Sequence, residues 1–263
     1  MSKINNIIAE LNRLKVCISN NNSQHTDRNR YMRSLWDLLS AEDDERLAED
    51  IVTHSDFPEL YQFYSRIWGQ YISSSERIHS ISISSGKETP ASVLAIEDYD
   101  ELVNEIDLVK ISPTDRIFVM VGSGPFPETL MKVYDLKNSF PTVIGVDRCH
   151  DSLELAQRIF FSCVQEKVYK KAIFINADGA EYNYEGASVI LLANGLKNKR
   201  GIIARASQTM ADNAVILARN PIRLGRMLYE DILNPIVIDG FKITGYVEPS
   251  RLSRTYVLQR DTL

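Results

Sequence analysis

The chain has 263 residues, of which 44% are hydrophobic and 25% are charged, the balance of an ordinary globular protein. Its formal net charge of −5 at pH 7 argues against a nucleic-acid partner, because such proteins usually carry a strongly basic patch or domain. No apolar run reaches the roughly 18 residues that a membrane span needs. Three cysteines without CxxC spacing argue against a disulfide framework or a zinc site. We therefore expect a cytoplasmic protein that has no membrane partner and holds no metal.

The first part of the chain has apolar residues at helical spacing. The first stripe consists of Ile4, Ile7, Ile8, Leu11 and Leu14. A later run over 60–78 is rich in tyrosine, phenylalanine and tryptophan, and polar or Gly/Pro-containing breaks fall at 19–24 and 84–90. This pattern predicts an α-helical bundle domain over residues 1–112.

After Pro113 the pattern changes to short, β-branched apolar runs that alternate with helical stretches. The predicted strands are 117–121, 142–146, 172–175, 188–192 and 214–218, and the clearest predicted helices between them are 128–136 and 152–168. Such alternation predicts a parallel sheet with helices on both faces. Two further strands, 241–247 and 255–259, are separated by Glu248-Pro249-Ser250 and are expected to form an antiparallel edge. Residues 113–263 are thus predicted to be a Rossmann-type α/β domain.

Small or polar residues follow the first four of these strands. They are Gly122, Ser123, Gly124 and Pro125 after the first, Asp147 at the end of the second, Ala177 and Asp178 after the third, and Asn194 after the fourth. Ligands bind at the carboxyl ends of such strands, so these residues predict one nucleotide-binding site. Asp147 is placed to accept hydrogen bonds from ribose hydroxyls, and Asp178 to reach an adenine amino group.

The loop after the first strand favours a cofactor without phosphates. A dinucleotide fingerprint has a third glycine where this chain has Pro127. Pro125 and Pro127 carry no N–H, so the loop lacks donors that a pyrophosphate would use. S-adenosylmethionine fits this loop better than NAD, and we expect it to act as a group-donating substrate.

At this loop the sequence resembles a known family. Residues 121–129 are similar to the GSGPLPLT segment of nicotianamine synthases and of shorter bacterial relatives that add an aminobutanoyl group to histidine in making opine metallophores. The likeness continues at 144–147, at 219–229 and in the closing strands, so it covers essentially all of 113–263. It implies a class I methyltransferase-like sheet and an enzyme of metallophore biosynthesis and metal acquisition. Such an enzyme transfers the 3-amino-3-carboxypropyl group of S-adenosylmethionine to an amino acid, here histidine, and releases methylthioadenosine.

The resemblance also implies roles for individual residues. The family's helical domain supplies a glutamate that takes a proton from the attacking amine, and Glu76 is the nearest carboxylate, because Trp68, Ile72 and Ser73 occupy the positions where that glutamate is expected. Tyr99 matches a tyrosine that the family places near the same chemistry. The family often has a second acid two residues after the ribose-binding one, where this chain has Cys149.

Substrate contacts are expected from both parts of the chain. Arg219, at the end of the fifth strand, is the candidate partner for a substrate carboxylate, ahead of Arg205, Arg223 and Arg226. Tyr64 and Trp68 are the other substrate-binding candidates, since the resemblance in the helical part is centred on them. The helical part would then cover the methionine end of the cofactor. Trp36, Trp68 and the surrounding aromatic run are also expected at the contact of a possible homodimer.

Two alternatives stay open. A methyltransferase that acts on a small molecule shares the fold but releases S-adenosylhomocysteine, and the Gly-Pro-x-Pro continuation of the loop favours aminobutanoyl transfer over it. A binding module that keeps the pocket without catalysis is suggested by the displaced glutamate. Direct metal binding is less favoured, because the four histidines are scattered without ligand spacing.

Overall fold

The computed structural model describes residues 2–20, 25–87, 99–107, 109, 116–136, 140–164, 170–232 and 240–261, with only the backbone described at 25–28 and 99–102. Its C-terminal part is a seven-stranded sheet. The strands are β1 (Ile117–Val121), β2 (Thr142–Asp147), β3 (Lys171–Asn176), β4 (Ala187–Leu192), β5 (Val215–Pro221), β6 (Phe241–Ser250) and β7 (Ser253–Arg260). All seven predicted strands are therefore present.

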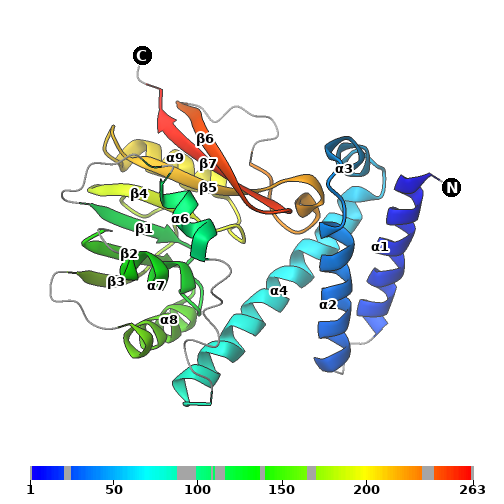
Figure 1. The fold of residues 1–263 in the computed structure, drawn as a ribbon, viewed down its shortest axis with the longest axis horizontal. Coiled ribbons are helices and arrows are strands. Elements are labelled where there is room, and N and C mark those ends of the chain that lie inside the picture. Colours follow the sequence, from blue (N-terminus) through cyan, green and yellow to red (C-terminus); the bar gives the residue numbers. More distant parts are fainter. Residues whose placement is uncertain are drawn as a thin grey trace.

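The strand order is β3-β2-β1-β4-β5-β7-β6 (Figure 1). Strands β1 to β5 are parallel, and β7 runs antiparallel between β5 and β6. The prediction of a Rossmann-type, class I methyltransferase-like sheet with an antiparallel edge is confirmed. One detail differs: the predicted connection at 248–250 is the end of β6, and the turn falls at 251–252.

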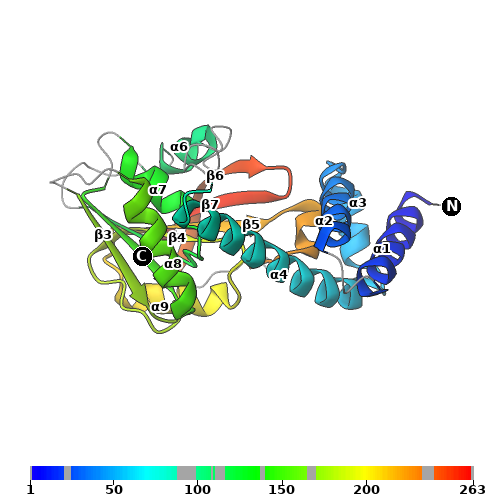
Figure 2. The same ribbon diagram turned by 90° about the horizontal axis from the view of Figure 1, so that it is seen from below.

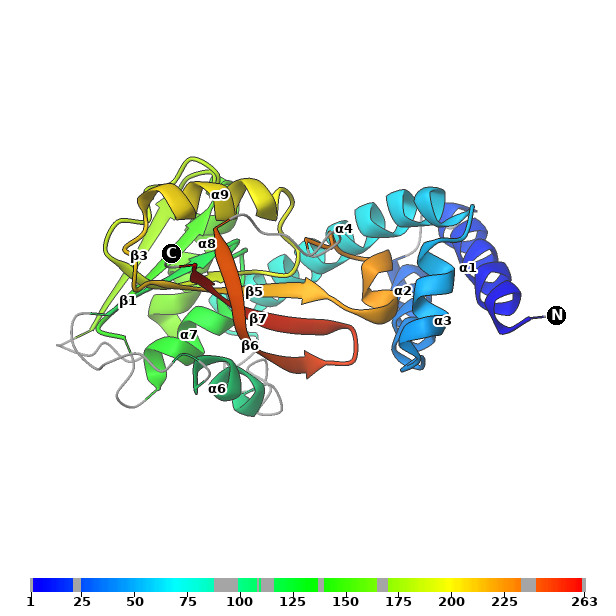
Figure 3. The ribbon, with the colours of Figure 1, turned by 90° about the horizontal axis from the view of Figure 1, so that it is seen from above.

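Helices cover both faces of this sheet, because alternate residues of the buried strands point to opposite sides. Phe118 of β1 packs with α7 (Glu128–Asp135) and α8 (His150–Cys163), whereas Val119 packs with α9 (Lys199–Thr209). Figure 3 shows α9 and α7 on opposite sides of the sheet. This arrangement leaves the carboxyl ends of the parallel strands free of covering helices, as a ligand edge requires.

The helical part consists of α1 (Lys3–Asn20), α2 (His25–Ser40), α3 (Glu45–Val52) and the first half of α4 (Phe57–Ser84). Its core includes four residues from the C-terminal part of the chain, namely Leu224, Met227 and Leu228 in or beside η2 (Arg223–Met227), and Leu252 in the β6–β7 turn. The proposed boundary between 112 and 113 lies outside the described residues and stays a prediction. The shared core nevertheless shows that the bundle is completed by the sheet half.

Helix α4 joins the two parts. With 28 residues it is about 42 Å long. Leu60, Tyr64 and Trp68, spaced by four, face the bundle core, whereas Ser80 and Ile83 near its end face the sheet. Figures 1 and 2 both show α4 running from the bundle to α8. Side chains in its second half are therefore carried to the ligand edge of the sheet.

Helix α6 (Tyr99–Asp107) follows α4 but packs on the sheet rather than on the bundle. Its Glu105 is buried and forms a bidentate ion pair with Arg219 of β5, at 2.9 Å from Nε and 2.6 Å from an Nη atom. Thr255 of β7 also donates to this carboxylate. No helix within the described ranges is long and apolar enough to cross a membrane.

Candidate functional site

The loop after β1 is shaped by glycines that no other residue replaces easily. Gly122 has φ +77° and Gly124 has φ +63°, the left-handed region that disfavours a side chain. A Cβ at Gly122 would lie 2.7 Å from Leu196 Cδ2, and a Cβ at Gly124 would lie 2.9 Å from Glu76 Oε2. The loop is therefore closed on one side by Leu196 and on the other by the carboxylate of Glu76.

Helix α4 is tied to this loop by a hydrogen bond. The Ser80 hydroxyl donates to the Pro125 carbonyl at 2.8 Å, and Ser80 is fully buried. Ser80 lies one turn after Glu76 on the same helix. The bond therefore holds α4 in the position that brings the Glu76 carboxylate next to Gly124. The Ser123 hydroxyl is buried within the same loop and has no hydrogen-bond partner among the described residues.

Asp147 organises the next part of the edge. Its carboxylate accepts hydrogen bonds from the backbone N–H groups of Gly124 and Cys149, both at 2.9 Å. Asn176, its pairing partner on β3, donates its side-chain amide to the Asp147 carbonyl at 2.9 Å. Asp178 is exposed just beyond β3, and one of its oxygens accepts from Ala180 N–H at 2.8 Å. Each carboxylate keeps acceptor capacity for a ligand.

Three carboxylates meet near Gly124, and their proximity changes the acidity of Glu76. Burial, together with the negative charges of Asp147 and Glu128, raises the pKa of Glu76 to about 7. Glu128 is itself paired with Lys132 at 2.7 Å. A carboxyl group with a pKa near 7 can both take up and release a proton at neutral pH.

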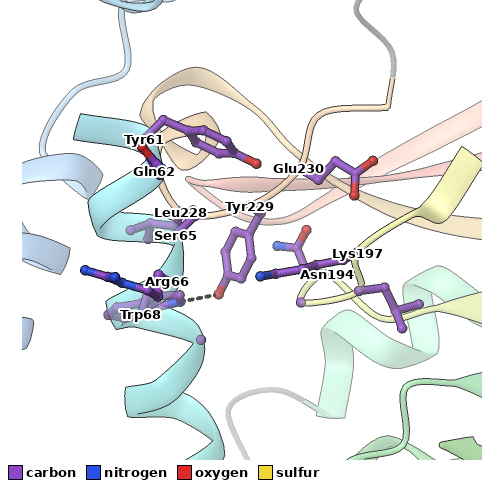
Figure 4. A pocket seen from close by; sticks show the side chains of 13 residues that line it. Tyr61, Gln62, Ser65, Arg66, Trp68, Asn194, Lys197, Leu228, Tyr229 and Glu230 are labelled. Atoms are coloured by element: carbon purple, nitrogen blue, oxygen red, sulfur yellow. Dashed lines mark hydrogen bonds between the residues drawn. The ribbon is translucent and has the colours of Figure 1, made fainter. Parts of the chain in front are cut away.

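A cavity of about 420 Å³ opens beside this edge, between the first half of α4, the loop 194–197 after β4 and residues 228–230 (Figure 4). Its wall includes Trp68 and Tyr229, whose side chains are joined by a 2.7 Å hydrogen bond from the indole N–H to the phenol oxygen. Burial raises the pKa of Tyr229, and the nearby charge of Glu76 acts in the same direction. Leu196 lines the cavity and also contacts Gly122, so the cavity adjoins the loop after β1.

The predicted cofactor residues come together in space. The C-terminal ends of neighbouring strands carry Gly122, Ser123, Gly124, Pro125, Asp147, Ala177, Asp178 and Asn194. Asn194 is oriented by Lys199, whose ammonium donates to the Asn194 oxygen at 3.4 Å and to the Arg219 carbonyl at 2.8 Å. Burial lowers the pKa of Lys199 to about 7. That these residues bind a cofactor stays a prediction. The structure does place them along one edge of the sheet, as a shared binding site requires.

The structure places two expected substrate residues elsewhere. Tyr64 is fully buried in the bundle, and its hydroxyl donates to the Leu11 carbonyl, so it does not reach the cavity. Arg219 is committed to Glu105 through both arms of its guanidinium. The position of Arg219 at the end of β5 predicted a side chain in the ligand crevice. It instead binds the buried carboxylate of Glu105 on α6, because leaving that buried charge unpaired would be costly.

The remaining candidates have mixed outcomes. Trp68 lines the cavity as expected. Tyr99 is the first residue of α6, and its side chain lies outside the described residues. The three other arginines bind elsewhere: Arg205 the Tyr182 carbonyl, Arg223 Glu248, and Arg226 Glu49.

The aromatic residues expected at a dimer contact are packed within the chain. Trp36 and Trp68 stack with ring centroids 5.4 Å apart, and Trp68 is 5% exposed. Trp68 therefore offers little surface to a second chain, whereas Trp36 is half-buried, and the homodimer contact stays a prediction. No cluster of three or more metal-ligating side chains occurs within the described part of the chain.

Sequence reasoning assigned no role to Tyr229, Lys197 or Lys199. Tyr229 ends the stretch 219–229 that resembles the family, which was a usable signal. Lys197 lies two residues before α9, and Lys199 is the first residue of that helix. Lysines at such positions are usually solvated, so nothing in the sequence separates the buried Lys199 from the exposed Lys197.

Comparison with known proteins places the fold. No protein-family model matches the sequence, and the search of curated proteins found no match. Among solved structures, the nicotianamine synthase MtNAS in complex with MTA and tNA has a TM-score of 0.80 at 16% identity, covering 98% of this chain and 98% of that chain. A mutant of MtNAS in complex with S-adenosylmethionine has a TM-score of 0.74 at 18% identity, covering 96% and 98%. The chain therefore shares the fold of MtNAS over both its helical and its sheet part.

Proposed function

We propose that this protein is an enzyme that transfers the 3-amino-3-carboxypropyl group of S-adenosylmethionine to the amine of an amino acid, with histidine as the acceptor, and releases methylthioadenosine. The observation that carries the proposal is the carboxylate of Glu76 against Gly124, next to a cavity large enough for a small molecule. A proton acceptor between the donor loop and an acceptor cavity is what this transfer needs.

The charges of the edge support a cationic donor. Glu76, Glu128 and Asp147 surround the loop after β1, and such a group of carboxylates would repel a pyrophosphate but attract a sulfonium. Asp147 would accept from the ribose hydroxyls, and Asp178 from the adenine amino group. Two crystal structures of MtNAS, whose fold this chain shares, hold S-adenosylmethionine in one case and MTA with tNA in the other.

The reaction is a single displacement. The neutral acceptor amine attacks the Cγ carbon of the methionine arm, the Cγ–S bond breaks with its electron pair, and methylthioadenosine leaves as a neutral thioether. The amine nitrogen then loses a proton to Glu76. Because the leaving group needs no acid, the protein contributes mainly alignment and this one proton transfer. A pKa near 7 suits Glu76 to accept it.

The acceptor would enter from the cavity that Trp68 and Tyr229 line, so that its amine meets Cγ rather than the methyl group. A product with several amines and carboxylates is a good metal chelator, which supports a role in metallophore biosynthesis and metal acquisition. In this proposal the bundle covers the methionine end of the donor, since α4 provides both Glu76 and the cavity wall.

Mass spectrometry of the products tests the proposal. The full chain is incubated with S-adenosylmethionine and amino acids, and we expect methylthioadenosine together with an aminobutanoyl adduct. Replacing Glu76 by glutamine should lower the transfer rate by about 100- to 10,000-fold, whereas Glu154→Gln on the exposed face of α8 should not change it. S-adenosylhomocysteine and a methylated acceptor would instead show a methyltransferase, and binding of S-adenosylmethionine without any product would show a binding module.

A further inference from the structure

Lys197 reaches into the cavity from the loop between β4 and α9. Figure 4 shows its side chain directed toward Tyr229, between the loop and α4. Within the described residues, its ammonium has neither a hydrogen bond nor an ion pair. Arg66 of α4 also lines the cavity and likewise has no carboxylate partner in the described part of the chain. The cavity thus contains two cations that form no ion pair within the described residues.

The backbone around Lys197 is held in place. Asn198 has φ +61°, its N–H donates to Glu230 Oε2 at 2.7 Å, and its side-chain oxygen accepts from Gly201 N–H at 3.3 Å. Lys199, the next residue, is anchored by its buried ammonium to the Arg219 carbonyl at 2.8 Å. The position from which Lys197 extends is therefore fixed before any ligand binds, which reduces the entropy that binding costs.

The acidic group in the cavity wall forms no ion pair with Lys197. Glu230 lines the cavity, but its carboxylate is bound to the backbone of Asn198. The side chain that sequence reasoning chose for a substrate carboxylate, Arg219, is occupied by Glu105. A carboxylate that enters this cavity has Lys197 as its available inward-facing cation, whereas the Arg66 guanidinium is directed away from Tyr229 and Lys197 (Figure 4).

We propose that Lys197 binds the carboxylate of the acceptor, so that the enzyme selects amino acids with a free carboxylate over their amides or simple amines. The inference rests on the proposed function and adds the group that orients the acceptor. With its carboxylate at Lys197, the acceptor presents its amine toward the loop after β1 and Glu76. Lys197 is exposed before the acceptor binds, and a charge-assisted hydrogen bond from it discriminates between charged and neutral ligands by about 10- to 100-fold.

The test compares histidine with histidinamide, which differ in the carboxylate, and measures kcat/KM for both in each variant. We expect the wild-type chain to prefer histidine by about 10- to 100-fold after correction for the fraction of neutral amine. Lys197→Met should bring the ratio close to one, mainly through a higher KM for histidine. Lys197→Arg should restore most of the preference, and Lys242→Met on exposed β6 should leave it unchanged.

Each outcome has a distinct meaning. An unchanged ratio in Lys197→Met, with methylthioadenosine still formed, overturns the inference and leaves the proposed function intact. A loss of S-adenosylmethionine affinity in Lys197→Met with an unchanged ratio also overturns it, because the lysine would then bind the donor. No aminobutanoyl product from any acceptor overturns the proposed function and this inference together.

Discussion

Two regions that meet at Glu76 carry opposite charge. The carboxyl edge of the sheet gathers the carboxylates of Glu76, Glu128 and Asp147 around one glycine loop. The cavity beside it has aromatic walls and the free cations Lys197 and Arg66 within the described residues. Under the proposed function, this difference would let the site distinguish its two ligands by charge, with the cationic donor at the edge and the anionic acceptor in the cavity.

The two regions also differ in how they are built. The edge is made mainly by residues that directly follow strands, and hydrogen bonds such as that from the Gly124 N–H to the Asp147 carboxylate stabilise it. The cavity is assembled from three distant segments: α4, the loop after β4, and residues 228–230. The shape of the cavity therefore depends on how α4 crosses from the bundle to the sheet, whereas at the edge only the position of Glu76 depends on that helix.

After Glu76→Gln, the largest effect on transfer is expected from Gly124→Ala. The new Cβ would require a left-handed backbone at φ +63° and would displace the Glu76 carboxylate, which lies 2.9 Å away. We expect transfer to fall by roughly 100-fold or more, measured as the rate of methylthioadenosine release. Gly186→Ala is the matched control, because it has φ +79° but an ordinary 3.6 Å contact far from the edge. Equal activity losses in both variants would mean that backbone strain, and not contact with Glu76, is responsible.

The second prediction concerns pH. Transfer needs both an ionised Glu76, whose pKa is about 7, and a neutral acceptor amine, whose ordinary pKa is about 8. It should therefore rise about 100-fold per pH unit below 7, about tenfold per unit between 7 and 8, and level off above 8. In Glu76→Gln only the amine ionisation should remain in the profile of the residual rate. A wild-type profile governed by the amine alone would remove Glu76 from the proton transfer.

The same substitution should stabilise the fold. Glu76 has a pKa raised from 4.5 to about 7, so the folded state holds its proton more tightly than the unfolded state. The free energy of unfolding is then unaffected below pH 4.5, falls as pH rises toward 7, and stays lower above it. Glu76→Gln should therefore raise the free energy of unfolding by roughly 2–3 kcal/mol at pH 8 and by little at pH 4. Urea unfolding at the two pH values measures this, and an equal effect at both would contradict it.

The sequence was sufficient for the edge and insufficient for the cavity. Strand-helix alternation predicted the sheet, and residues such as Asp147 needed only their position after a strand to be assigned to the edge. Arg219 had the same kind of position, yet Glu105, 114 residues earlier, binds it. Tyr64 resembled a substrate residue, but helical periodicity does not tell which face of α4 meets the bundle. Pairings between distant segments decided these outcomes, and local patterns do not encode them.

The smallest expected effect tests whether the edge attracts its ligand by charge. Cys149 is exposed two residues after Asp147 and is the N-cap of α8, with no side-chain capping bond. Cys149→Asp should bind S-adenosylmethionine about two- to fivefold more tightly at low salt, because exposed charge pairs contribute less than about 1 kcal/mol and are screened by salt. Cys149→Asn caps the helix equally well without the charge and should leave the affinity unchanged. Titration calorimetry with S-adenosylmethionine and with the uncharged thioether S-adenosylhomocysteine separates the two contributions. A gain for both ligands, or in both variants, would show that the edge responds to helix capping and not to the sulfonium charge.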